Sequence, residues 1–307
     1  MAMKVKSILL LNIFMLIMMG QTLFAQSDAA DNNANYQQAL NLYNSGKAAE
    51  GIPYLENILK TNSTIKPAAY DLLGNIYDQT HQEQKAIETY QEGIKLDPAY
   101  QSLRFNLGIA YFRNKQYADA EASAIEAIKL GPKHAYSQRL YGLVTFHQNK
   151  RVNALLALCN FILMDPTGPR AGEAFTNIQS ILKGGVLKPD EVVPTKDKDD
   201  LALNNGLAGI IAASKTKKLP PMELLEYQLK SVFIMGGQLS AKKTNKSFFD
   251  NHYAAFFYKL SQSPQLSTFV RIVSIGGNKD EYVKWKQDNT QQLLALDNWI
   301  ATTERGF

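Results

Sequence analysis

The sequence has little cysteine and little histidine, and both shortages exclude classes of site. Cys159 is the single cysteine, so no intramolecular disulfide can form and a four-cysteine zinc site is excluded. Four histidines are scattered along the chain without metal-ligand spacing: His81, His134, His147 and His252. The sequence therefore predicts no metal and no cofactor.

Strong net charge is also missing. The chain has 33 basic and 28 acidic residues among 307, and 45% of its residues are hydrophobic. This composition is typical of a globular protein rather than a disordered one. A weak positive balance gives no electrostatic case for a nucleic-acid partner. Beyond the first 25 residues there is no apolar run of 18, so we predict no stable membrane anchor after processing.

The N-terminal residues have the pattern of a targeting sequence. Lys4 and Lys6 precede an apolar run at 8–19, and Gly20 and the stretch 21–26, with the small residue Ala25, follow it. A basic start, a short apolar run and a small residue at the cut are typical of a secretory signal peptide. We predict a signal peptide over 1–25, cleavage after Ala25 and export to the periplasm of a Gram-negative bacterium. An uncleaved anchor and a buried core helix are the alternatives. No cysteine follows the cut, which excludes a lipoprotein anchor.

A 34-residue period runs through the first half of the chain. Its pattern is an aromatic residue, Leu-Gly, a second aromatic residue, then Ala, a further aromatic or small residue, and Pro. One copy reads Tyr70-x2-Leu73-Gly74-x2-Tyr77, followed by Ala86, Tyr90, Gly93 and Pro98. The next two copies contain Leu107-Gly108 with Ala120 and Pro132, and Tyr141-Gly142 with Ala154 and Pro166. We place repeats at 67–100, 101–134 and 135–168, with a weaker copy at 32–65 that is followed by one extra residue, Lys66.

This pattern resembles the tetratricopeptide repeat (TPR) family. The resemblance implies two antiparallel helices per repeat, with small residues where the helices approach closely and proline before the next repeat. One such hairpin cannot bury its apolar face alone, so the hairpins stack. We therefore predict an all-α fold, a TPR superhelix of about four helix-turn-helix repeats over 32–168 followed by a helical C-terminal bundle.

In the TPR family the first helix of each repeat lines a concave groove that binds extended peptides or partner helices. The resemblance places these candidate groove residues on this chain: Tyr43, Asn75, Phe105, Asn106, Ile109, Phe112, Arg113, Tyr136, Arg139, Leu143 and Phe146. Tyr36, Leu40, Asp71, Asp78 and His147 occupy further groove positions. An exposed apolar stripe on a concave face usually marks a contact site. The occupant is an unidentified protein or peptide, or the second half of this chain.

Some TPR proteins clamp a peptide carboxylate with two asparagines and three cations. Asn75 and Asn106 sit where the asparagines belong, but Asp71 occupies the first cation position. Tyr136 and Leu140 occupy the other two. Because an acidic residue repels a carboxylate, we reject that clamp. The asparagines are either backbone-binding groups, since an amide both donates and accepts, or solvated surface residues.

The second half is helical and less regular. We predict a capping helix within 169–183, a linker over 184–199 and a helical C-terminal domain over 200–307. Segments whose apolar residues have helical spacing alternate there with Gly or Pro residues that end helices. Helices are expected at about 200–214, 220–239, 246–262, 264–275 and 278–303. The charge run 196–200 is expected to be solvated.

Six aromatics and a histidine fall within 248–258. Side chains on more than one helix face predict a central, largely buried helix. Trp285 and Trp299 are fourteen residues apart, nearly four helical turns, so we expect them to share one face of a final helix that packs on the aromatic segment. This pattern resembles the C-terminal part of some exported bacterial TPR proteins.

The leading functional hypothesis is a non-enzymatic exported scaffold or adaptor. The chain has none of the nucleophile, zinc or phosphate-binding motifs of common enzymes, and Cys159 is interpreted as a packing thiol. The alternative is an undetected enzymatic activity in the C-terminal module, with Asp250, His252 and Tyr258 as the place to look. That alternative requires His252 to face a cavity. A third hypothesis is self-assembly through the faces of the solenoid.

Overall fold

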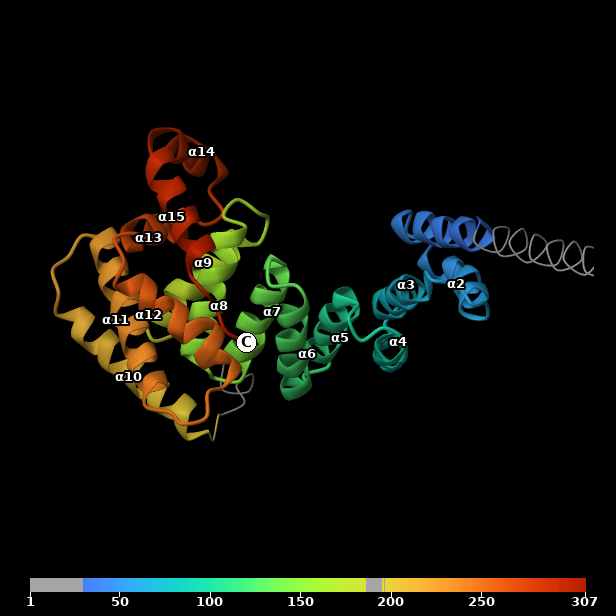
Figure 1. Ribbon diagram of the computed structural model, residues 1–307, viewed down its shortest axis with the longest axis horizontal. Coiled ribbons are helices and arrows are strands. Elements are labelled where there is room, and N and C mark those ends of the chain that lie inside the picture. The colour runs from blue at the N-terminus through green and yellow to red at the C-terminus, as the bar shows by residue number, and fades with distance from the viewer. Residues whose placement is uncertain (1–29, 186–194, 196) are drawn as a thin grey trace, which may run out of the picture. The chain divides into compact units, whose positions relative to one another are not determined.

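The computed structural model of the protein describes residues 30–185, 195 and 197–307 (Figure 1). The predicted all-α class is confirmed, because every regular element in these ranges is a helix. The predicted signal peptide lies outside the described residues, as does most of the predicted linker. Within the described ranges no helix has both the length and the apolar character to span a bilayer. The chain forms two compact units that divide between Ala110 and Tyr111, here called the N-terminal and C-terminal units.

The N-terminal unit is a series of helical hairpins. It contains a helix over 30–44, η1 (Ala48–Gly51), α2 (Ile52–Leu59), α3 (Lys66–Gln79), α4 (Glu83–Leu96) and the first part of α5 (Gln101–Arg113). Its core includes Ala39, Leu55, Ile58, Ala69 and Ile76, all fully buried. Half-buried aromatic side chains such as Tyr36 and Tyr43 pack against this core from the first helix.

The turn between the two helices of a repeat has the same backbone in four places. His81, Lys115 and Asn149 adopt positive φ at intervals of 34 residues, and Gly46 does so 35 residues before His81. The extra residue at Lys66 accounts for the longer interval. In each case the next amide donates to the carbonyl five residues back, as in a Schellman motif. These bonds, 2.8–2.9 Å long, are Lys47 N to Leu42 O, Gln82 N to Tyr77 O, Gln116 N to Tyr111 O, and Lys150 N to Thr145 O.

The small residues of the repeat pattern allow close helix packing. A Cβ added at Gly74 would lie 2.3 Å from Cε1 of Tyr90, and one at Gly142 would lie 2.9 Å from Cγ of Leu158. The recurring alanines at 86, 120 and 154 are fully buried. A larger residue at either glycine would push the second helix of the hairpin away.

The C-terminal unit contains the remaining repeats and the bundle. Its helices are α6 (Tyr117–Leu130), α7 (Ala135–His147), α8 (Arg151–Met164), α9 (Ala171–Leu182), α10 (Lys198–Lys215), α11 (Pro221–Ala241), η3 (Phe249–Ala254, a π-helix), α12 (Ala255–Ser261), α13 (Leu266–Ser274), α14 (Lys279–Asp288) and α15 (Thr290–Thr302).

Helix α8 is the centre of this unit. It contacts α7, α9, α10, α13 and η3, and Figure 1 shows it among the helices of the unit. Every residue from Val152 to Ile162 is buried, as a helix packed on several sides requires. Cys159 lies inside this stretch, where burial raises the pKa of its thiol, in keeping with a packing role.

The expectation of one final helix with paired tryptophans is wrong. The segment is two helices, α14 and α15, that meet at Asn289, whose side-chain amide donates to the carbonyl of Trp285 at 2.9 Å. Because the helix is interrupted at Asn289, Trp285 lies on α14 and Trp299 on α15, so the two tryptophans share no helix face. Trp299 does pack on the aromatic segment, with its ring centroid 5.3 Å from that of Phe256.

Candidate functional site

In the N-terminal unit, predicted groove positions from successive repeats lie together. The amide of Asn106 on α5 donates to the carboxylate of Asp71 on α3, with Nδ2 and Oδ1 2.8 Å apart. The pKa of Tyr36, on the helix over 30–44, is raised mainly by burial of its hydroxyl and further by the negative charge of Asp71. Three consecutive first helices therefore contribute to one polar patch, which we call the Asp71 patch: Tyr36, Asp71, Tyr100 and Asn106.

The Asp71 carboxylate has no cation beside it in the part of the chain that the structure describes. Its hydrogen-bond donor is the neutral amide of Asn106. Burial raises the pKa of Asp71 to about 6, and the Asn106 bond only partly offsets this. The pKa of Tyr100 is likewise raised mainly by burial and further by the charge of Asp71. A half-buried carboxylate without a counter-ion favours a positively charged ligand group.

Other predicted groove residues of this unit are engaged within their own repeats. The Tyr90 hydroxyl donates to Oδ1 of Asn75 at 2.8 Å, which ties the two helices of that repeat together. Tyr43 packs against the buried core. Phe105 and Ile109 on α5 are half-buried. The site that the unit presents is therefore the Asp71 patch rather than a pair of free asparagines.

In the C-terminal unit, several predicted groove residues contact their own unit. Phe112 lies edge-on to His147 with ring centroids 5.0 Å apart, and Tyr136 packs edge-on against Phe161 at 5.7 Å. Arg139 forms an ion pair with Glu173 of α9 at 2.6 Å. Leu143 is half-buried and Arg113 is exposed. Phe146 is only 8% exposed, so it was wrong to expect it in an exposed apolar stripe.

The second half of the chain covers part of α7. Tyr253 of η3 stacks on Tyr141 with ring centroids 5.4 Å apart, and its hydroxyl donates to the side chain of Gln138. Phe248 lies edge-on to Tyr141 at 5.6 Å. The C-terminal helices therefore close this end of the repeat array, which the sequence pattern alone left open.

His252 is enclosed by aromatic rings. It stacks on Phe248 and Phe307 at centroid distances of 5.0 and 5.1 Å, and it is 1% exposed. Burial, with help from nearby Arg305, lowers its pKa to about 4. Asp250 is paired with Lys243, and Tyr258 is 38% exposed. Lys243 and the aromatic rings thus engage these side chains separately, and His252 is absent from the lining of three of the main cavities in the described residues.

The C-terminal tail supplies a buried cation that sequence reasoning missed. The guanidinium of Arg305 donates to Oδ1 of Asn160 on α8 at 2.8 Å and lies 3.5 Å above the Phe256 ring. Burial lowers its pKa to about 10. Figure 1 shows the chain end beside α7 and α8. A lone arginine at the third position from the end of a sequence carries no local signal for such a contact.

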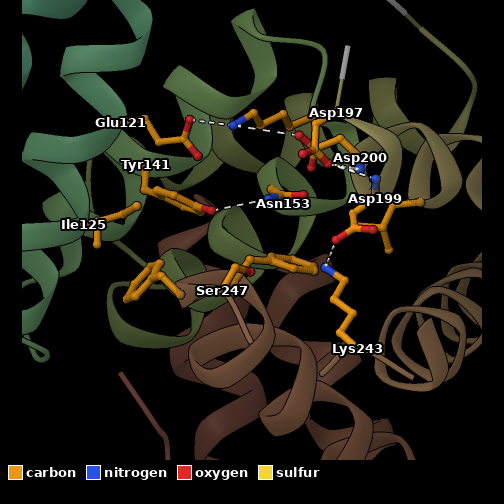
Figure 2. Close-up of a pocket in the computed structure, with 13 residues that line it drawn as sticks. Glu121, Ile125, Tyr141, Asn153, Asp197, Asp199, Asp200, Lys243 and Ser247 are labelled. Atoms are coloured by element: carbon orange, nitrogen blue, oxygen red, sulfur yellow. Dashed lines mark hydrogen bonds and ion pairs between the residues drawn. The ribbon is translucent and has the colours of Figure 1, made fainter. Parts of the chain in front are cut away.

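A polar cavity of about 210 Å³ lies where α6, α7 and α8 meet the start of α10 and the segment before η3 (Figure 2). We call it the acidic cavity. Its charged lining consists of Glu121, Lys150, Asp197, Asp199, Asp200 and Lys243. Among the described residues no three His, Cys, Asp or Glu side chains group to hold a metal ion.

The charge run at 196–200 was expected to be solvated. That was wrong for Asp200, which is buried, whereas Asp197 and Asp199 are exposed. Asp197 caps α10 by accepting from the amides of Asp199 and Asp200. Asp199 pairs with Lys243 at 2.9 Å, and Asp200 lies 3.8 Å from Lys150. Burial raises the pKa of Asp200, an effect that the Lys150 charge opposes. Tertiary contacts give Asp199 and Asp200 their lysine partners, whereas Asp197 bonds to the first turn of its own helix.

Comparison with known proteins gives the repeats their family. A sequence model described as TPR repeat matches residues 74–115, and one described as tetratricopeptide repeat matches 105–169. Residues 74–169 are TPR repeats. The predicted resemblance is thus confirmed for the repeat region, which is also where the positive-φ turns recur.

Two curated relatives align with the TPR region. The photosystem I assembly protein Ycf3 of Prochlorococcus marinus is 32% identical over 91 residues, which is 30% of this chain and 47% of that protein. Human tetratricopeptide repeat protein 6 is 33% identical over 63 residues, or 20% of this chain and 12% of that protein. The chain therefore spans less than half the length of these relatives.

Two solved structures are similar at low identity. A tetratricopeptide repeat protein from Parabacteroides merdae is 10% identical, with 80% of this chain and 99% of that chain covered and a TM-score of 0.44. MamA from Desulfovibrio magneticus is 14% identical, with 62% and 98% covered and the same TM-score.

Proposed function

We propose that this protein is a non-enzymatic, exported adaptor that binds a segment of another protein at the Asp71 patch of its N-terminal unit. The observation that carries the proposal is a half-buried carboxylate with no cation beside it among the described residues, placed where consecutive first helices meet. Its hydrogen-bond donor is the neutral amide of Asn106.

The chemistry of the Asp71 patch suits a basic side chain. A lysine or arginine from the partner would supply the missing counter-charge through a charge-assisted hydrogen bond. Tyr36 and Tyr100 flank the carboxylate, and aromatic faces favour cations. The name of the Prochlorococcus relative, an assembly protein, is in keeping with a role that works through protein contacts.

Export rests on the sequence pattern of residues 1–25. If the signal peptide is cut as proposed, N-terminal sequencing of protein from a periplasmic fraction will read from Gln26. Intact Met1 on the mature protein would contradict both the cleavage site and the export proposal.

The binding proposal is tested by photo-crosslinking in intact cells. A photoreactive amino acid replaces Tyr36, beside Asp71, and in a matched control it replaces Glu88, which is exposed on the second helix α4. We expect an adduct at position 36 that is lost in the Asp71→Asn background and no equivalent adduct at position 88. The linked peptide should contain lysine or arginine. Equal adducts with and without Asp71→Asn would contradict the proposal.

The choice of position matters because not every predicted groove residue can serve as a probe. Truncating Phe146 to alanine would open a cavity in the C-terminal unit, and such changes cost about 3–5 kcal/mol. Loss of binding in that variant would report on folding. Asp71→Asn instead keeps the shape of the patch and changes its charge.

A further inference from the structure

The acidic cavity has more negative charge than its own lysines neutralise. Four carboxylates and two ammonium groups line it. Lys150 already pairs with Glu121 at 2.7 Å and lies 3.8 Å from Asp200. Lys243 already pairs with Asp199 at 2.9 Å and with Asp250, which does not line the cavity, at 3.0 Å. Both lysines are thus committed, and the lining retains an excess of two negative charges.

The wall also presents a buried acceptor without a partner. Asn153 on α8 is 5% exposed, and its Oδ1 has no hydrogen bond within the described structure. Its Nδ2 donates to the Tyr141 hydroxyl at 3.3 Å, as Figure 2 shows. A buried acceptor left unpaired destabilises the folded state. A ligand with an N–H donor would remove this destabilisation.

The rest of the lining is apolar and aromatic. Ile125, Tyr141, Leu203, Phe248 and Phe249 complete the wall. A cavity of about 210 Å³ is several times the roughly 30 Å³ that one water occupies in the liquid. It is large enough for a short alkyl chain that contacts these rings, while aromatic faces also attract cations.

These observations together point to one ligand class. We propose that the acidic cavity binds a small primary alkylammonium ion, whose ammonium group donates to Asn153 and to the carboxylates of Asp200 and Glu121. A bare metal ion suits the cavity less well, because no three acidic or histidine side chains are grouped around one point in the described residues. A neutral ligand would leave the excess charge uncompensated.

The proposal concerns only the C-terminal unit and does not depend on the Asp71 patch. All charged groups of the cavity lie between Glu121 and Lys243. An amine bound there would contact α6, α8 and α10 at once. It would therefore stabilise the docking of the C-terminal helices on the repeats of this unit by binding the folded state only.

The test is calorimetric titration of the full chain with cadaverine, a five-carbon diamine, and with 1,5-pentanediol, its neutral counterpart. We expect saturable binding of cadaverine at millimolar concentration or below, a raised melting temperature and no heat from the diol. Asp200→Asn and Asn153→Leu should each weaken cadaverine binding by about tenfold. Asp280→Asn, which removes an exposed carboxylate on α14, should leave it unchanged.

Three results of the amine and diol titrations would overturn the proposal. They are no saturable heat from cadaverine, equal heats from cadaverine and the diol, and equal affinity in Asp200→Asn and Asp280→Asn. Displacement of cadaverine by stoichiometric calcium or magnesium would assign the cavity to a metal and also overturn it. The wild-type comparison of amine and diol needs no variant, so misfolding of a variant does not weaken the test. A capped Ala-Lys-Ala peptide, titrated in parallel, distinguishes a free amine from a lysine side chain as the source of the ammonium.

Discussion

Replacing Asp71 with asparagine should make the N-terminal unit more stable while it removes the binding determinant. The Asp71 carboxyl has a pKa of about 6 in the fold, raised mainly by burial from 3.8. Between these values the folded state holds a proton that the unfolded chain has released. Stability is therefore greatest at low pH and falls as the pH rises through 6.

The magnitude follows from the size of the shift. A pKa difference of one unit corresponds to 1.36 kcal/mol, so the charged carboxylate destabilises the fold by up to about 3 kcal/mol at pH 8. Asparagine at position 71 keeps an oxygen for the Asn106 amide and carries no charge. The Asp71→Asn variant should thus gain up to about 3 kcal/mol at pH 8 and nothing at pH 3.

Urea unfolding followed by far-UV circular dichroism measures this gain. Both tryptophans, Trp285 and Trp299, lie in the C-terminal unit, so tryptophan fluorescence tracks that unit separately and should not change. Glu88→Gln, at an exposed position on α4, is the matched control. The same stability at pH 8 in the variant and the wild type, or a gain that does not depend on pH, would refute the reasoning.

Three further predictions concern packing and burial. Gly74→Ala should destabilise the N-terminal unit by about 1–3 kcal/mol, because the new methyl group collides with the Tyr90 ring; urea unfolding measures this, and a neutral effect would contradict the close approach. His252 has a pKa of about 4 in the fold against about 6.5 unfolded, so the unfolding free energy of its unit should fall by up to about 3 kcal/mol as the pH drops through that window. His252→Phe should remove this dependence, as read by tryptophan fluorescence, and an unchanged pH profile would count against it. Tyr253→Phe, which leaves Gln138 without its buried donor, should cost about 1–3 kcal/mol, and a stabilising effect would be the contrary result.

The repeat region could be predicted from the sequence because its determinants are local and recur. Gly74 and Tyr90 lie in the same hairpin, and the turn residues His81, Lys115 and Asn149 follow the same 34-residue period as the motif. Residues that contact each other in a repeat are therefore close together in the sequence, and the sequence pattern reveals the contact. The helical class of the second half followed from apolar periodicity in the same way.

The candidate sites could be predicted only in part, because their contacts join distant residues. Asp71 and Asn106 were mapped to groove positions, but the bond between them depends on the stacking of consecutive repeats. The charge run was interpreted as solvated because nothing near it in sequence shows that Lys150 and Lys243 reach its acids. Arg305 contacts Asn160, which is 145 residues away in the sequence. Local sequence patterns give no information about contacts at that separation.

The most direct test of the account asks what the Asp71 patch selects. The purified chain is immobilised and used to select peptides from a random displayed library, in parallel with Asp71→Asn and Glu88→Gln. The account predicts enrichment of peptides with a lysine or arginine at a fixed position, retained with Glu88→Gln and lost with Asp71→Asn. A neutral or acidic consensus, or the same basic consensus selected by Asp71→Asn, would contradict it.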